Sequence, residues 1–209
     1  GTTTIPDQVA LNLTGGTLVN NSQLNVAGAF NLNAGAFTGS GGITMAGGTL
    51  AKPAGSSIAW TNSGLMTNTG TINLADADIS NQIDNRGTIN LGGSLNFSQP
   101  FVNAGILEAR SGTSNFAAGL QQNGGSLKLA GGNLQGPVSL NGGSLGGSGT
   151  IAGDLNIGSG TLSPGASPGK LVVTGNLNLT VGSSTLIEIG GATPGIGYDY
   201  VQVLGTAHL

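Results

Sequence analysis

Three aspartates in one stretch of the chain have the residue type and spacing that could hold a metal ion. Asp76 and Asp78 stand two apart, which places both side chains on one face of an extended strand, and Asp84 follows soon after. Carboxylate oxygens are ligands that Ca²⁺ prefers. Arg86 is the basic residue within reach, and its spacing predicts an ion pair with Asp84. We expect no metal site, although these aspartates could form one, because a solvated polar edge is the simpler interpretation.

The rest of the chain offers little for nucleophilic catalysis. Its single histidine, His208, is next to the last residue and cysteine is absent, so a Ser-His-Asp or Cys-His system is not expected. The segment 165–169 has the G-x-S-x-G spacing of a nucleophile elbow. However, Pro168 follows the serine and has no N–H to donate to an oxyanion. We therefore expect a protein that is not an enzyme and needs no cofactor.

Composition excludes several classes of partner. Only 6% of the residues are charged, the net charge is −3, and the five Lys and Arg residues are scattered, without the basic stripe that binds a phosphate backbone. No apolar run approaches the ~20 residues of a membrane-spanning helix. Glycine reaches 41 residues, but apolar residues make up 37% of the chain and recur at regular positions. The sequence thus predicts a folded chain with no nucleic-acid partner and no membrane span.

A repeat of about eighteen residues runs through the middle of the chain. The pentapeptide Gly-Thr-Ile-Asn-Leu occurs at 70–74 and again at 87–91. An Asn-x-Gly pattern followed by an apolar residue recurs at steps of 17, 18, 20 and 18 residues. Its asparagines are Asn68, Asn85, Asn103, Asn123 and Asn141. Stacked amide side chains hydrogen-bond along a parallel stack, so these five residues are predicted to form one structural ladder.

Short segments of alternating polarity accompany the repeat, for example 71–74, 94–97 and 154–157. Each has one apolar face and is bounded by glycine, which is typical of strands separated by tight turns. Both a meander of antiparallel hairpins and a parallel β-solenoid use such strands. Only the solenoid stacks like residues in columns. The repeat therefore favours an all-β solenoid with about three short strands per coil, roughly eleven coils and a length of ~50 Å.

Alignment of the repeats predicts which side chains face the interior. One inward column contains Ile72, Ile89, Leu107, Leu127 and Leu145, and the next contains Leu74, Leu91, Ala109, Leu129 and Gly147. The outward column between them contains Asn73, Asn90, Glu108, Lys128 and Gly146. In this register Glu108 and Lys128 are neighbours of opposite charge. Aromatic residues make up only 4% of the chain, so we expect most of them in a narrow core without room for stacked rings.

The C-terminal part of the chain carries a more specific motif. Residues 159–175 are Ser-Gly-Thr-Leu-Ser-Pro-Gly-Ala-Ser-Pro-Gly-Lys-Leu-Val-Val-Thr-Gly, and segments 184–190 and 197–207 continue the pattern. This region, 159–207, resembles the passenger-associated repeat of bacterial autotransporters and two-partner-secreted exoproteins. Residues 15–153 are similar in style to filamentous-haemagglutinin-like β-helices. The resemblance implies a right-handed parallel β-helix, secretion to the bacterial outer surface, and a role in adhesion or as a stalk.

One expectation and two alternatives follow for the whole chain. We expect residues 1–209 to form a single β-helix segment excised from a larger protein, with passenger-like coils at 159–209. Its expected role is non-enzymatic presentation in a secreted bacterial surface adhesin, as a monomer that contacts a glycan or protein of a host or neighbouring cell. One alternative is a carbohydrate-active or glycan-binding β-helix that uses Asp76, Asp78 and Asp84. The other is a pure spacer with no ligand.

Overall fold

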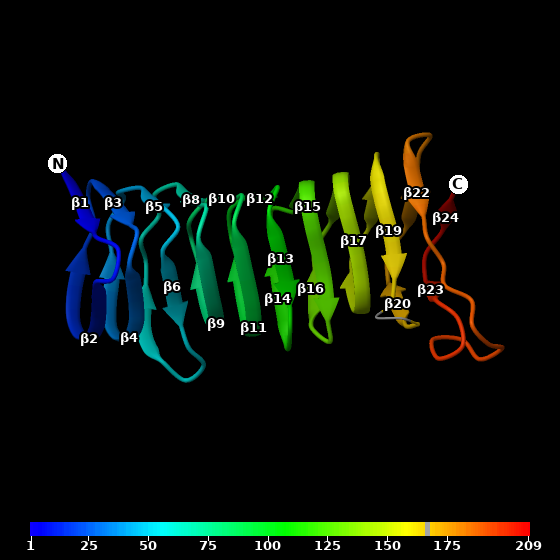
Figure 1. The fold of residues 1–209 in the computed structure, drawn as a ribbon, viewed down its shortest axis with the longest axis horizontal. Coiled ribbons are helices and arrows are strands. Elements are labelled where there is room, and N and C mark those ends of the chain that lie inside the picture. The colour runs from blue at the N-terminus through cyan, green and yellow to red at the C-terminus, as the bar shows by residue number, and fades with distance from the viewer. Residues whose placement is uncertain (166–167) are drawn as a thin grey trace.

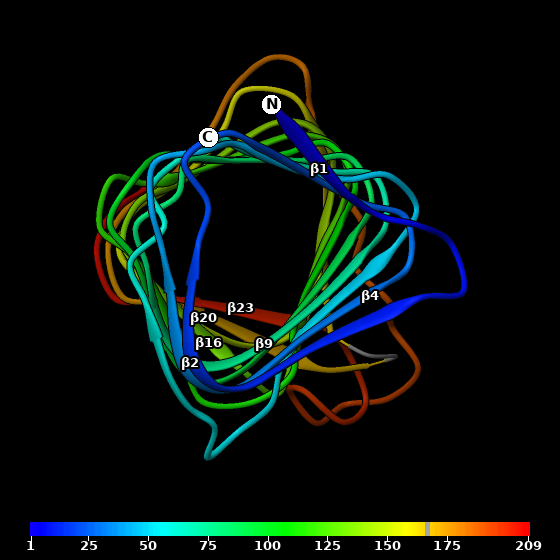
Figure 2. The ribbon, with the colours of Figure 1, turned by 90° about the vertical axis from the view of Figure 1, so that its left-hand side faces the viewer.

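The short strands wind into a right-handed parallel β-helix (Figure 1). The computed structural model describes residues 1–165 and 168–209. Within these ranges it has 24 strands, and the ladders between them are parallel. Figure 2, which looks along the rod, shows a three-sided outline. The predicted all-β solenoid with about three strands per coil is therefore confirmed.

The first face of the rod is a stack of eleven strands among the described residues. They are β1 (Thr2–Ile5), β3 (Gln23–Val26), β5 (Ile43–Met45), β8 (Met66–Asn68), β10 (Ile83–Asn85), β12 (Phe101–Asn103), the starts of β15 (Leu120–Ala130) and β17 (Val138–Ala152), β18 (Leu155–Ile157), β21 (Leu177–Leu179) and β24 (Ala207–His208). This stack makes about ten turns, or ~48 Å at ~4.8 Å per turn. The number is slightly below the expected eleven because the last turns, from Leu155 to Ala207, are longer than the repeat.

The other two faces complete each coil. The second face contains the first parts of β2 (Ala10–Val19), β4 (Ala29–Thr38), β9 (Thr71–Ile79) and β11 (Thr88–Phe97), together with β6 (Thr49–Lys52), β13 (Ile106–Ala109), later parts of β15 and β17, β19 (Gly160–Pro164) and β22 (Ser183–Thr185). The third face contains the ends of β2, β4, β9, β11 and β17, with β7 (Ser57–Trp60), β14 (Thr113–Phe116), β16 (Asn133–Gln135), β20 (Lys170–Val173) and β23 (Tyr200–Val203).

Both predicted inward columns lie in the core. Strand pairing continues the first column from Ile72 through Leu107 to Leu145, and these three side chains have no measurable exposure. The second column runs in the same register from Leu74 to Gly147. Burying one Leu or Ile side chain contributes roughly 1.5–3 kcal/mol, so these columns are the main source of the rod's stability.

The five phenylalanines and Trp60 pack inside the rod, as expected for most aromatic residues, but the expectation that rings cannot stack there is wrong. Phe97 and Phe116 are stacked, with ring centroids 4.8 Å apart and planes 6° from parallel. Phe101 contacts both rings edge-on. Because Phe97 and Phe116 are register partners on successive coils, the rise of one coil brings their rings to stacking distance. A narrow core therefore favours stacking along the axis.

The glycine of the repeated pentapeptide lies where successive coils approach most closely. A Cβ atom added to Gly87 would lie 2.2 Å from the carbonyl oxygen of Gly70. One added to Gly105 would lie at the same distance from the carbonyl oxygen of Gly87. These contacts are far shorter than van der Waals separation, so the corner between the first and second faces requires glycine.

The passenger-like region, 159–209, forms the last coils of the stack. β20 pairs with β23, and β21 pairs with β24. The carboxylate of Asp199, which is 4% exposed, accepts hydrogen bonds from the backbone N–H groups of Gly169 and Glu188, both at 2.9 Å. Two residues of the motif, Ala166 and the Ser167 of the G-x-S-x-G spacing, lie outside the described residues. In the part that is described, we find no helix with the length and hydropathy of a membrane span.

Candidate ligand-binding site

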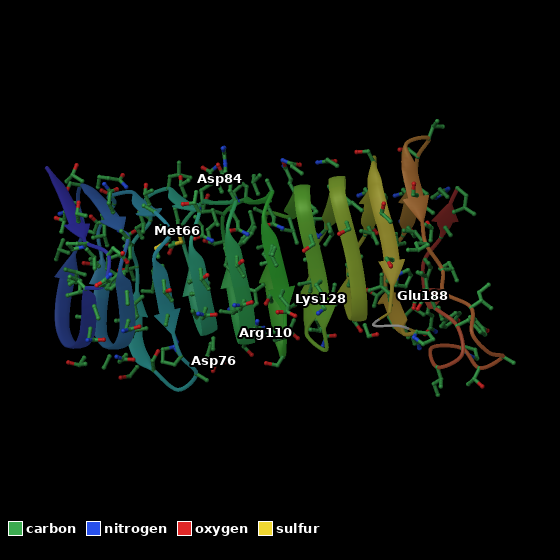
Figure 3. All side chains as sticks on the ribbon, in the orientation of Figure 1. Met66, Asp76, Asp84, Arg110, Lys128 and Glu188 are labelled. Atoms are coloured by element: carbon green, nitrogen blue, oxygen red, sulfur yellow. The ribbon has the colours of Figure 1, made fainter. Side chains whose placement is uncertain are left out.

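The three candidate aspartates do not come together. Asp76 and Asp78 both lie on β9. Asp76 is at the corner between the second and third faces, and Asp78 is on the third face. Asp84 lies on β10 of the first face. Figure 3 shows Asp76 and Asp84 at opposite edges of the rod. In residues 1–165 and 168–209 no three acidic, His or Cys side chains group in a way that could hold a metal ion. The hypothesis of one site shared by the three aspartates is wrong, because the third face and the corner after it separate Asp76 from Asp84.

The first two aspartates instead connect neighbouring coils. The Oδ1 atom of Asp76 accepts a hydrogen bond from the backbone N–H of Ser94 at 2.9 Å. The Oδ1 atom of Asp78 accepts one from the Asn96 Nδ2 at 2.6 Å. Asp76 also has a φ of 50°, in the left-handed region that Asp tolerates better than most residues. Both carboxylates thus have structural partners on the polar edge of the rod.

Asp84 forms the predicted ion pair with Arg86. The Nη2 and Nε atoms of Arg86 donate to the Oδ2 of Asp84 at 3.1 and 3.3 Å. The two side chains are 66% (Arg86) and 30% (Asp84) exposed. An exposed ion pair contributes about 0–1 kcal/mol to stability. The pair therefore adds little to stability and leaves two charged groups at the surface, where a ligand can reach them.

A groove of about 430 Å³ lies beside this ion pair. Its lining combines apolar Leu65, Val102 and Ala104 with polar Gln82, Asp84, Arg86 and Asn123. Asp84, Val102 and Asn123 lie on β10, β12 and β15, and the other lining residues lie directly before or after β8, β10 and β12, so successive coils bring them together. Sequence reasoning found Asp84 and Arg86 but missed the groove, because its other members are scattered along the chain. We call this surface the Asp84 groove.

The predicted asparagine ladder exists for its first three members. Asn68 Nδ2 donates to Asn85 Oδ1 at 2.7 Å, and Asn85 Nδ2 donates to Asn103 Oδ1 at 2.6 Å. Asn103 Nδ2 then donates to Gln122 Oε1 at 2.6 Å. All four side chains are buried. The ladder thus continues through Gln122, and the prediction that Asn123 is its next member is wrong.

The same correction applies to Asn141. Strand pairing aligns Asn103 with Gln122 and Gln122 with Leu140, so Asn123 and Asn141 are each one residue out of register. A shift of one residue turns a strand side chain to the opposite face. Asn123 and Asn141 are exposed, and they form a separate pair in which Asn141 Nδ2 donates to Asn123 Oδ1 at 3.0 Å.

The predicted contact between Glu108 and Lys128 is present and is part of a small charge cluster with Arg110; Figure 3 labels Arg110 and Lys128. Lys128 Nζ lies 3.3 Å from Glu108 Oε1, and Arg110 Nε lies 2.8 Å from Glu108 Oε2. The hydrogen bond from Arg110 lowers the pKa of Glu108, against an opposing effect of its burial, and Lys128 adds to the lowering. The cluster connects adjacent coils electrostatically.

A buried lysine was not expected from the sequence. Lys52 occupies the inward column next to Leu74 and is only 3% exposed. Its Nζ donates to the backbone carbonyl of Ala75 at 2.8 Å. Burial lowers the pKa of Lys52 by desolvating the ammonium group, and the negative charge of Asp76 opposes this effect. The sequence indicated the burial of Lys52 only through its position. Lys52 follows Leu50 by two residues, so the two side chains lie on the same, buried face of the strand.

Lys52 is expected to give the protein a stability that increases at alkaline pH. In the window just below the ordinary lysine pKa of 10.5, the unfolded chain keeps the Lys52 proton while the folded chain releases it. The unfolded state then binds more protons, so the free energy of unfolding rises with pH. Urea unfolding of the wild type and Lys52→Met across this window measures the difference. If the free energy of unfolding rises equally with pH in the wild type and in the variant, this placement of Lys52 is contradicted.

Comparisons with protein-family models, with curated proteins and with solved structures give no match to this chain. Function must therefore be argued from the rod and its surface.

Proposed function

We propose that this chain is a non-enzymatic presentation segment of a secreted bacterial surface adhesin, which contacts a glycan or protein on a host or neighbouring cell. The observation that carries the proposal is the stack of about ten turns around one continuous apolar core. Such stacks are quasi-one-dimensional, and the extended surfaces they create are commonly used for binding. The passenger-like motif at 159–207 supports secretion and placement at the bacterial outer surface.

The arrangement of polar groups also supports a binding role over catalysis. The carboxylates of Asp76 and Asp78 each accept a hydrogen bond from the neighbouring coil, and Glu108 is held between two basic side chains. General acid-base catalysis needs titratable groups that converge on one substrate position. In the described residues the acids that could do so are distributed over different faces, whereas the polar sides of the rod are long enough to make contact with a surface.

Adhesion of protein-coated beads tests the proposal. The sequence has no cysteine, so Gly1→Cys gives a single attachment point at one end of the rod. We expect fluorescent beads that carry this variant to adhere to epithelial or bacterial cells more than beads that carry an unfolded form of the same chain. A second variant, Leu209→Cys, reverses the rod on the bead. Because the proposed contact lies along the sides, adhesion should persist in both orientations.

The unfolded control can differ by one residue. Leu107→Asp is expected to disrupt the fold, while Thr88→Asp adds the same charge on the outside of the neighbouring coil. Loss of adhesion with the first change and retention with the second would show that the folded surface is responsible. If correctly folded beads adhere no better than unfolded ones to any cell type, the chain acts as a spacer and the adhesin proposal fails.

A further inference from the structure

One position on the outside of the first face departs from the pattern of its column. The outward-facing residues of the successive strands are Thr4, Asn25, Thr44, Thr67, Asp84, Val102, Gln121, Ser139, Asn156, Asn178 and His208. Ten of these eleven are polar, and Val102 lies directly between Asp84 and Gln121. Nothing inside the rod requires an apolar residue there, because the side chain of Val102 points away from the core.

Val102 is part of the Asp84 groove, whose lining contains other apolar residues. Leu65, which is 50% exposed, and Ala104 also line this groove. Exposed apolar side chains that occur singly need no explanation, but a cluster within a hollow is typical of ligand sites. The polar side chains of Gln82 and Asn123 lie on the same lining and carry both donors and acceptors. A lining that combines apolar surface with a few polar groups is the usual composition of a small-molecule pocket.

The charges of the groove indicate a neutral ligand. Its lining has one cation, Arg86, and one anion, Asp84, which are paired at 3.1 Å. An anionic ligand would gain from Arg86 but would meet the carboxylate of Asp84 beside it. A ligand that both donates and accepts hydrogen bonds can use the two groups together, since the carboxylate only accepts and the guanidinium only donates.

We propose that the Asp84 groove binds a unit of a neutral saccharide. The apolar C–H face of a sugar ring would lie on Val102, next to Ala104 on the same side of the chain. Ring hydroxyls would donate to Asp84 and accept from Arg86, and the amide of Asn123 would contact a further hydroxyl. A volume of about 430 Å³ lies at the lower end of the range of ligand pockets and suits one or two sugar rings. This inference rests on the proposed contact role and names the ligand class.

Backbone amide chemical shifts of the ¹⁵N-labelled full chain test the proposal. The probes are lactose, cellobiose, maltose and chitobiose, with digalacturonic acid as the charged comparison. We expect at least one neutral disaccharide to shift amides of β10, β12 and the start of β15 with a Kd on the order of 1 mM. Digalacturonic acid is expected to bind at least fivefold more weakly than that disaccharide. Absence of shifts on this face with all four neutral probes, or tighter binding of the charged one, would overturn the inference.

Two variants and a matched control separate binding from folding. Val102→Thr keeps the shape of an exposed side chain but replaces apolar surface with a hydroxyl, and we expect affinity to fall at least threefold. Arg86→Gln removes the guanidinium group and its N–H donors, and it is expected to weaken binding at least fivefold. The control is Asp78→Asn on the third face, which should bind as the wild type does. Unchanged affinity in both groove variants would show that the disaccharide binds elsewhere, and the inference would fail.

The bead experiment distinguishes this inference from the proposed function. If beads adhere to cells but neutral disaccharides leave the first face unshifted, the adhesin proposal stands with a different contact. If a disaccharide binds the groove but beads do not adhere, the groove is a saccharide site and the presentation role fails.

Discussion

Leu107→Asp is expected to unfold the centre of the rod. The Leu107 side chain is 0% exposed and lies between its register partners Ile89 and Leu127. The change removes packing worth roughly 2–5 kcal/mol and places a carboxylate where the described neighbours provide no counter-ion. A folded domain has only about 5–15 kcal/mol of stability in total. Because each coil is stabilised by its neighbours, the damage should extend to the coils on both sides.

Urea unfolding followed by far-UV circular dichroism measures this effect. Thr88→Asp is the matched control, since Thr88 is the outward-facing register partner of Ile106, beside Leu107. We expect the control to cost less than ~0.5 kcal/mol. A similar loss of stability in the two variants would mean that the inside and outside of these coils are assigned wrongly.

Asn85→Leu is expected to cost roughly 2–4 kcal/mol, although leucine is apolar and the position is buried. The change removes the donor to Asn103 Oδ1 and one acceptor of Asn68 Nδ2, and both atoms stay inside the rod. Size is not the problem, because the same column holds Met45 before the ladder and Leu140 after it. The cost comes from buried polar groups that lose their partners.

Two comparisons isolate the role of this inner ladder. Asn90→Leu is a matched change on the outside of the neighbouring face, where Asn90 Nδ2 donates to Asn73 Oδ1 at 2.7 Å. It should cost less than ~1 kcal/mol, because water can replace the lost partner of Asn73. Replacing the whole ladder with leucine, at Asn68, Asn85, Asn103 and Gln122, removes the side-chain donors and acceptors of the ladder together, and only backbone partners such as the Gly70 N–H lose a bond. Its cost should be well below four times that of Asn85→Leu, and an additive result would contradict this explanation.

The periodic part of the fold was predictable from the sequence because apolar residues recur at the same positions of successive coils. Ile72 and Ile89 belong to identical pentapeptides, and this identity fixes the register of two coils directly. The prediction then extends to Leu107, and with it the contact between Glu108 and Lys128. Alternation within each strand settles which side chains are buried, since neighbours along a strand point to opposite faces.

The errors arose where the coil length changes. The corner after Gln122 has three residues, 123–125, whereas the corner after Asn103 has two, 104–105. An alignment on the Asn-x-Gly pattern places the extra residue before Asn123 instead of after it. It therefore pairs Asn103 with Asn123, whereas the structure pairs Asn103 with Gln122. The Asp84 groove was missed for a related reason. Val102 is unusual only beside Asp84 and Gln121, and that comparison requires the register of three coils.

The coil-upon-coil arrangement has a mechanical consequence. A pull on the chain ends would load the terminal coils first, because each strand is hydrogen-bonded only to the coils before and after it. Detaching one coil of about eighteen residues would release about 60 Å of extended chain, more than the ~48 Å length of the intact rod. A cell held by such a rod would therefore experience a tether that lengthens in steps under tension before the attachment breaks.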